Sequence, residues 1–230
     1  MAIKPILFNK QISTEMVRAI LDGRKSCTRR LVKPQPDEKH TFPLGFVTDS
    51  TEKKEVGCFV FGIDEYGGSI QYAKPPYQPG DILYVRETWS PVFVRPRRYL
   101  YKVECKDVEN LPIKWHPSIR MPKEAARIWL KVTDVRVERL QDIDEDGVWN
   151  EGFRFTPPCL TRVSADGHTC DLDGPCTSHI KYCDMTMGEL FGRELWDKTI
   201  KKSDLDRYGW SANPYVFVIE FERCEKPEGV

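Results

Sequence analysis

The spacing of the apolar residues changes several times along the chain, and the spacing typical of a helix appears first near the N-terminus. From residue 12 to 21 the apolar residues recur every three to four positions, which predicts an amphipathic helix. Ser13 is suited to cap its start. Gly23 is suited to end it, because helices commonly stop at a glycine with positive φ. Residues 5–8, ahead of the helix, predict a short first strand.

Most of the remaining apolar positions alternate with polar ones, as expected for strands that are buried on one face. In the longest run the apolar residues fall on even positions up to Val132 and on odd positions from Val135, and this change predicts a β-bulge or bend. Residues 33–49 are polar and rich in proline, which predicts a loop. The predicted strands are 58–61 and 69–72, which form a hairpin, followed by 82–87, 99–104, 127–140 and 215–221.

Two further helices have clear start and stop signals. Asp144 can cap a short helix that ends at Gly152, and Thr186 with Glu189 forms a capping box that opens another. The segment between them, residues 153–184, is polar and rich in cysteine. Many short strands with few helices indicate an α+β protein with a mixed or antiparallel β-barrel and peripheral helices. We predict one domain over residues 1–230, with residues 153–184 as an insert.

Composition and charge limit the classes of protein to which the chain can belong. The 230 residues include 35 basic and 35 acidic side chains, and 40% are hydrophobic, so a sizeable core can form. The balance of charge excludes a large non-specific nucleic-acid surface, although not a small basic pocket. No apolar run approaches the roughly 20 residues that cross a bilayer, and the N-terminus lacks the features of a signal peptide. We therefore expect a cytoplasmic protein without a membrane partner. The sequence does not determine its oligomeric state.

The first helix leads into the segment Gly23-Arg24-Lys25-Ser26-Cys27-Thr28-Arg29-Arg30. Its glycine, lysine, threonine and last arginine match the GxKxxTxR motif, and the chain resembles the ASCH family of PUA-like proteins. The order of elements in residues 5–152 and 186–224 is similar to that of ASCH proteins common in bacteriophages and prophages. The resemblance implies a PUA-like β-barrel and a site built on this motif.

The resemblance also implies an activity. Small ASCH enzymes hydrolyse the amide of N4-acetylcytidine and use a lysine, a threonine and a glutamate, which correspond here to Lys25, Thr28 and Glu151. Other relatives bind RNA, and some are nucleases. The candidate activities are therefore an amidohydrolase of N4-acetylcytidine or a related modified nucleoside, a non-catalytic reader of RNA or of a modified base, and a ribonuclease.

The chemistry of these residue types fits amide hydrolysis. A threonine hydroxyl needs a neighbouring base to act as a nucleophile, and a lysine can serve when burial and nearby positive charge lower its pKa. Arg24, Arg29 and Arg30 supply such charge, and no cofactor is required. The alternative is that these basic residues bind phosphate while Thr28 bonds the backbone. Cys27 would point away from Thr28 on a strand, which favours a core thiol.

Further candidates for substrate binding lie outside the motif. Trp89 and Trp210 can stack on a base, or they can belong to the core. Tyr208 is a further aromatic candidate for stacking. Asn213 can read a base edge, although an asparagine before proline is also an ordinary turn residue. Glu87, at the end of the predicted strand 82–87, completes the candidate set.

Four cysteines lie in the insert, which has few apolar residues to order it. Four thiolates can hold a structural zinc ion in a closed tetrahedral site. Free thiols on a loop are the main alternative, because the spacings are not those of paired CxxC motifs, and disulfides are a third. The candidate zinc ligands are Cys159, Cys170, Cys176 and Cys183.

The hypotheses differ in what they require of Lys25, Thr28 and Glu151. If these three side chains converge on a pocket of nucleoside size, hydrolysis is favoured. If Glu151 points away from the other two, binding without chemistry is favoured.

Overall fold

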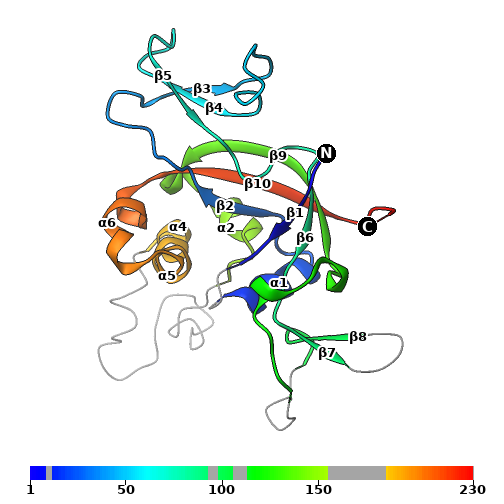
Figure 1. The fold of residues 1–230 in the computed structure, drawn as a ribbon. Helices are drawn as coiled ribbons and strands as arrows, with labels where there is room; N and C mark the ends of the chain where they lie inside the picture. The colour runs from blue at the N-terminus through cyan, green and yellow to red at the C-terminus, as the bar shows by residue number, and fades with distance from the viewer. Residues whose placement is uncertain (9–11, 93–97, 106–112, 155–184, 230) are drawn as a thin grey trace, which may run out of the picture.

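The fold is built on a five-stranded sheet (Figure 1). The computed structural model describes residues 1–8, 12–92, 98–105, 113–154 and 185–229. The first pair of strands is parallel and the other three pairs are antiparallel. Within the described residues no backbone ladder joins the two outer strands to each other, so the pairing does not form a closed ring. The strand order is β1 (Ile3–Ile6), β6 (Ile82–Val85), β9 (Trp129–Arg139), β10 (Tyr215–Cys224) and β2 (Cys27–Leu31).

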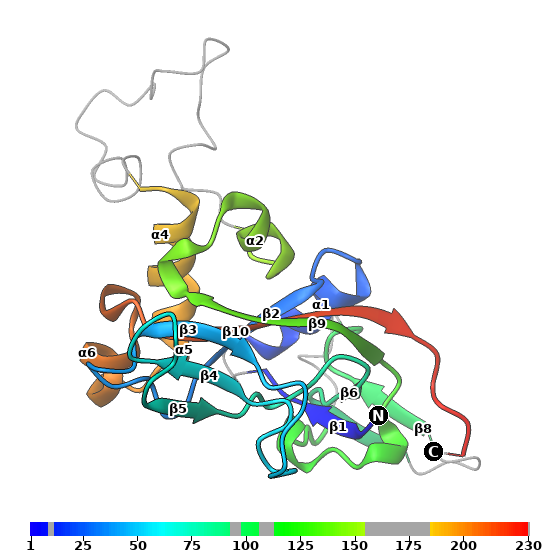
Figure 2. The same cartoon turned by 90° about the horizontal axis from the view of Figure 1, so that it is seen from above.

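A smaller sheet lies on the opposite side of the central sheet from the helices (Figures 1 and 2). It contains β3 (Phe42–Phe46), β4 (Phe59–Gly62) and β5 (Ile70–Ala73). The Phe61 ring lies 4.9 Å from the Tyr215 ring of β10, so aromatic packing joins the two sheets. The hairpin prediction is confirmed by β4 and β5. The loop prediction is wrong where β3 forms, because pairing with β4 outweighs the weak strand propensity of a segment with proline and glycine.

The long strand β9 contains the predicted irregularity. Asp134 pairs with Glu220 and Val132 pairs with Phe221, which leaves Thr133 as an extra residue opposite β10. The extra residue changes which face of the sheet the side chains point to, so that Val132 and Val135 are both buried. A separate hairpin joins β7 (Trp89–Val92) and β8 (Arg98–Tyr101).

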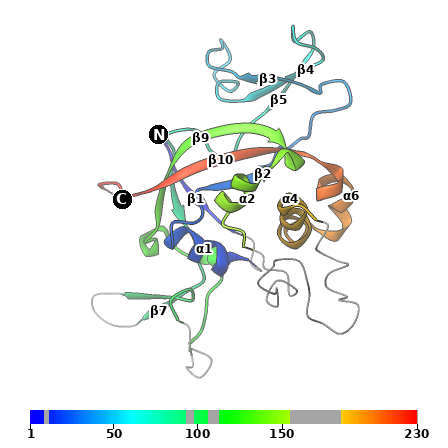
Figure 3. The same ribbon diagram turned by 180° about the vertical axis from the view of Figure 1, so that it is seen from behind.

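The helices are short and surround the motif segment (Figure 3). In that view α2 lies between α1 and α4, in front of β2. The α-helices are α1 (Ser13–Leu21), α2 (Glu145–Asn150), α4 (Met187–Phe191), α5 (Asp197–Thr199) and α6 (Leu205–Tyr208). A π-helical turn, η6 (Gly192–Trp196), continues α4, and the 3₁₀ turns are η2 (Ser118–Arg120), η3 (Lys123–Ala125), η4 (Leu140–Asp142), η7 (Lys202–Asp204) and η8 (Trp210–Ala212).

The capping signals are confirmed for two of the three predicted helices. The Asp144 carboxylate accepts a hydrogen bond of 2.7 Å from the Gly147 N–H, and Thr186 and Glu189 form the capping box. The prediction for Ser13 is wrong by one residue. Ile12 occupies the cap and Ser13 belongs to the first turn, where its hydroxyl is buried and has no hydrogen-bond partner among the described residues.

The architecture is α+β, as predicted, with a main core to which the central sheet, the helices and the smaller sheet all contribute. In the described part of the chain no helix combines the length and hydropathy needed to cross a membrane. Residues 155–184, which make up almost all of the predicted insert, lie outside the described residues.

Candidate functional site

The motif segment turns sharply from α1 into β2. Gly23 adopts a φ of +72°, as predicted, and the backbone N–H groups of Arg24 and Lys25 both donate to the Ala19 carbonyl. The Ser26 N–H then donates to the Asn150 carbonyl over 2.9 Å. These backbone bonds hold the motif against the end of α2.

A buried ion pair lies at this junction. The Lys25 ammonium donates to Glu151 Oε2 over 2.6 Å and to the Glu151 carbonyl over 2.8 Å. The two side chains are only 1% and 5% exposed, so solvent screens their attraction weakly. Their backbones also form a bridge, and Gly152 permits the close approach. A Cβ at Gly152 would lie 2.8 Å from the Ala19 Cβ.

Arg29 completes the charge balance beneath the pair. Its backbone N–H donates to Glu151 Oε1 over 2.6 Å, and its guanidinium donates to Glu138 Oε1 over 2.7 and 3.0 Å. Burial opposes the charge of this guanidinium, but the Glu151 and Glu138 carboxylates outweigh that effect and raise the pKa of Arg29. Arg29 therefore stays cationic and fixes the orientation of the Glu151 carboxylate.

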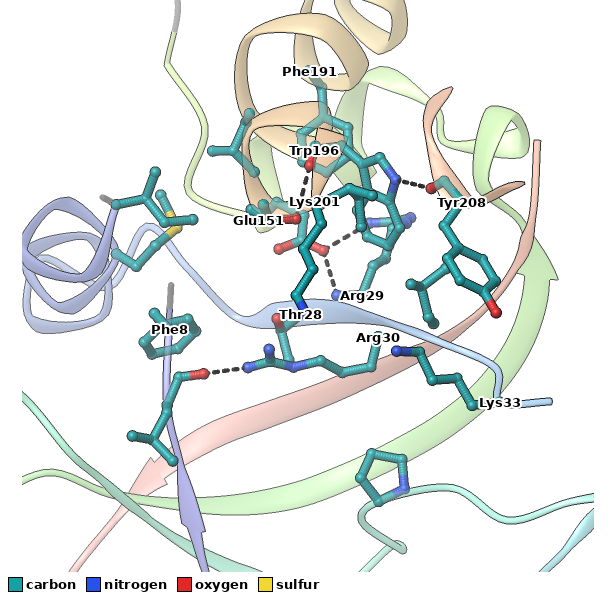
Figure 4. Close-up of a pocket in the computed structure, with 18 of the residues that line it drawn as sticks. Phe8, Thr28, Arg29, Arg30, Lys33, Glu151, Phe191, Trp196, Lys201 and Tyr208 are labelled. Carbon is teal, nitrogen blue, oxygen red and sulfur yellow. Dashed lines mark hydrogen bonds and ion pairs between the residues drawn. The ribbon is translucent and has the colours of Figure 1, made fainter. Parts of the chain in front are cut away.

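These residues lie at one wall of a cavity of about 840 Å³ (Figure 4). Small-molecule sites in proteins commonly measure about 300–1,000 Å³, so a nucleoside fits. Thr28 is buried in β2 and lines the same cavity as Lys25 and Glu151. Arg30 crosses it and donates to the Leu7 carbonyl over 2.6 Å. The structure thus brings together five of the residues predicted for the site.

Five aromatic side chains also line the cavity, and four of them belong at the same time to the main core. The Trp196 indole N–H donates to the Tyr208 carbonyl over 2.8 Å, which holds the indole in place. Flat rings are the surfaces on which bases stack in sites for single-stranded nucleic acids. Of these rings the sequence indicated only Tyr208 as a candidate for stacking, because the others become neighbours only in the folded chain. The aromatic residues in the lining are Phe8, Tyr77, Phe191, Trp196 and Tyr208.

Five other predicted residues lie outside this cavity. Arg24 points away from it and bonds Asp22 over 3.0 Å, at the rim of a smaller cavity. Glu87 is buried and forms a two-pronged ion pair with Arg127, at 2.9 and 3.0 Å. Burial raises the pKa of Glu87 in spite of that arginine.

The two tryptophans and the asparagine have structural surroundings. Trp89 packs in a separate apolar cluster with Trp129. Trp210 belongs to the main core. Asn213 adopts a φ of +45°, and its side-chain oxygen accepts from the Gln141 N–H over 2.9 Å. The two tryptophans therefore belong to the core and the asparagine to a turn, which are the alternatives to substrate binding that the sequence leaves open.

The cysteine predictions divide between two parts of the chain. Cys27 is buried beside the ion pair, and burial is the main cause that raises the pKa of its thiol to about 12, which fits a core thiol. The candidate zinc ligands Cys159, Cys170, Cys176 and Cys183 lie outside the described residues. In the described ranges, no three histidine, cysteine or acidic residues cluster as metal ligands do.

No protein-family model matches the chain, and no curated protein matches it. Among solved structures the chain is similar to the crystal structure of an ASCH domain from Lactobacillus crispatus JV V101. That similarity has a TM-score of 0.34 and 10% sequence identity, and it covers 96% of this chain and 79% of that chain. The resemblance to the ASCH family continues to rest on the motif at residues 23–30 and on the order of elements around it.

Proposed function

We propose that this chain is a PUA-like ASCH protein that binds a nucleoside or an RNA base in the cavity and hydrolyses the N4-acyl amide of a modified cytidine. One observation carries the proposal. Lys25, Thr28 and Glu151, from segments more than 120 residues apart, meet on one cavity of nucleoside size. This convergence is what hydrolysis requires and what a binding module does not need.

In this proposal the Thr28 hydroxyl gives its proton to Lys25 and attacks the acyl carbon. The C–N bond then breaks as Lys25 passes that proton to the leaving amino nitrogen, which releases cytidine and leaves an ester on Thr28. Water then hydrolyses the ester to the free acid and restores Thr28. Lys25 can take the Thr28 proton only as a neutral amine. The 2.6 Å hydrogen bond to Glu151 provides a path on which Lys25 first gives up a proton. Arg29 holds Glu151 in place during both steps.

The direct test is incubation with N4-acetylcytidine, with released cytidine and acetate measured over time. We expect Lys25→Ala to lower the rate by about 10²–10⁴-fold, the usual contribution of an acid–base group. Thr28→Ala should lower it at least as much, because the nucleophile itself is lost. Thr28→Ser should keep part of the activity. Arg24→Ala, which changes a motif residue outside the cavity, is the matched control. Absence of hydrolysis by the folded wild-type protein would contradict the proposed reaction.

Binding without chemistry is the second candidate, and the ion pair itself favours it. Lys25 and Glu151 satisfy each other, and no hydrogen bond joins the Lys25 ammonium to the Thr28 hydroxyl in the described structure. Under this candidate cytidine or a short RNA binds, and its affinity is unchanged by Thr28→Ala. Cleavage of the RNA in the same experiment would instead support a nuclease.

A further inference from the structure

The charge around the cavity is unequal, although the whole chain is neutral. Six basic side chains and two acidic side chains line the cavity. Lys25 and Arg29 are neutralised by Glu151 and Glu138, as described above. The remaining positive charge therefore comes from four residues, which are Arg30, Lys33, Lys74 and Lys201.

Three of these four cations are exposed lysines that line the cavity. Lys33 follows β2, Lys74 follows β5 and Lys201 precedes η7, so each comes from a different part of the chain. In Figure 4 the Lys201 side chain extends toward Thr28, and Lys33 lies beside Arg30. Among the described residues none of the three lysines has an acidic side chain within 4.0 Å, unlike Lys4 or Lys198 on the same molecule.

The neighbours of these cations leave their charge available. The Lys33 ammonium lies 5.5 Å from the centre of the Tyr208 ring, and Arg30 donates to a neutral carbonyl. Asp204 is the second acidic residue of the lining, and the hydroxyl of Ser203 donates to it over 3.0 Å. Bringing several like charges together is unfavourable unless an anion binds among them.

We propose that Lys33, Lys74 and Lys201, together with Arg30, form a phosphate-binding subsite, so that the substrate is a cytidine nucleotide or a cytidine within RNA rather than the free nucleoside. This inference rests on the proposed function for the position of the base, which places the ribose toward the lysines. A phosphate group attached to that ribose would then meet ammonium groups from three segments. Phosphate oxygens accept strong charge-assisted hydrogen bonds from such groups.

The test measures binding of cytidine, cytidine 5′-monophosphate and a trinucleotide RNA with a central cytidine, by calorimetry at two salt concentrations. The variants are Lys33→Gln, Lys74→Gln, Lys201→Gln and the triple combination. Lys53→Gln, which changes an exposed lysine outside the cavity, is the control. We expect the wild type to prefer the monophosphate over cytidine by on the order of tenfold or more, with the preference weakened by salt.

Each lysine substitution should weaken the binding of the monophosphate by about fivefold and leave the binding of cytidine unchanged, whereas the control should change neither affinity. Tighter binding of the trinucleotide assigns the lysines to an RNA backbone, and equal or tighter binding of the monophosphate assigns them to a mononucleotide. Either result supports the subsite. Equal affinity for cytidine and its monophosphate, or a preference that survives in the triple variant, would overturn it.

Hydrolysis assays on the same variants separate this inference from the proposed activity. If N4-acetylcytidine and its 5′-monophosphate are hydrolysed with equal kcat/KM, the phosphate subsite is wrong and the proposed reaction stands. If neither is hydrolysed but the lysine-dependent preference for phosphate persists, the proposed reaction is wrong and the subsite stands.

Discussion

Removing both partners of the Lys25–Glu151 pair should destabilise the fold by less than the sum of the two single removals. At 2.6 Å and an effective dielectric constant of about 20, Coulomb's law gives an attraction of about 6 kcal/mol, part of which offsets the cost of burying two charges. Each single substitution should therefore lower the free energy of unfolding by about 3–5 kcal/mol. Glu151→Gln should lower stability more than Lys25→Met. When the lysine is gone, Arg29 still pairs with Glu151, whereas the loss of the Glu151 charge leaves Lys25 without its partner.

The assay is a double-mutant cycle from urea unfolding at pH 7, followed by the fluorescence of the six tryptophans. The double variant Lys25→Met with Glu151→Gln should be more stable than the summed single effects predict, by about 2–3 kcal/mol. The exposed pair Lys131–Glu222, at 4.0 Å, is the control and should show a coupling below about 1 kcal/mol. If each single substitution lowers the free energy of unfolding by less than about 1 kcal/mol, and the two losses simply add in the double variant, the reasoning is refuted.

Three further predictions concern other parts of the molecule. Hydrogen bonds from Lys4 and two backbone N–H groups outweigh burial and lower the pKa of Asp81, so its stabilisation is present above the ordinary value of 3.8 and lost as pH falls below it. Asp81→Asn should cost about 1–2 kcal/mol at pH 7 in urea unfolding, and a cost that does not shrink toward pH 3 would contradict this. Cys27, whose thiol has a pKa of about 12, should resist iodoacetamide at pH 8 until the protein unfolds; mass spectrometry that finds rapid modification of the native protein would contradict its burial. Gly192→Ala would place a Cβ 2.2 Å from a ring atom of Trp210 and should cost about 1–3 kcal/mol, whereas an unchanged melting temperature would show that the helix can shift.

The features that could be predicted from the sequence depend on neighbouring residues. The turn at Gly23, the cap at Asp144 and the capping box at Thr186 each involve atoms within six residues of one another. The bulge at Thr133 can also be predicted, because the apolar residues switch from even to odd positions between Val132 and Val135. Such signals carry the local backbone geometry and therefore the positions of most elements.

The features that could not be predicted depend on contacts between distant segments. Strand β3 forms through its pairing with β4, and the burial of Trp89 depends on a cluster around Trp129 that no local pattern indicates. The basic lining of the cavity needs Lys33, Lys74 and Lys201 to converge from three segments. The role of Glu151 follows from the family resemblance alone, since no local pattern links it to Lys25.

The distance along the chain between Lys25 and Glu151 has a practical consequence. A cavity made from segments 126 residues apart exists only in the folded chain, so its ligand binds the native state alone. At a ligand concentration one hundred times Kd, such binding adds about 2.7 kcal/mol to stability. For a chain of this size that corresponds to a rise in Tm of roughly 5–10 °C. Thermal melting in the presence of a panel of nucleosides, nucleotides and short RNAs can therefore rank the ligands of this cavity without any assay of catalysis.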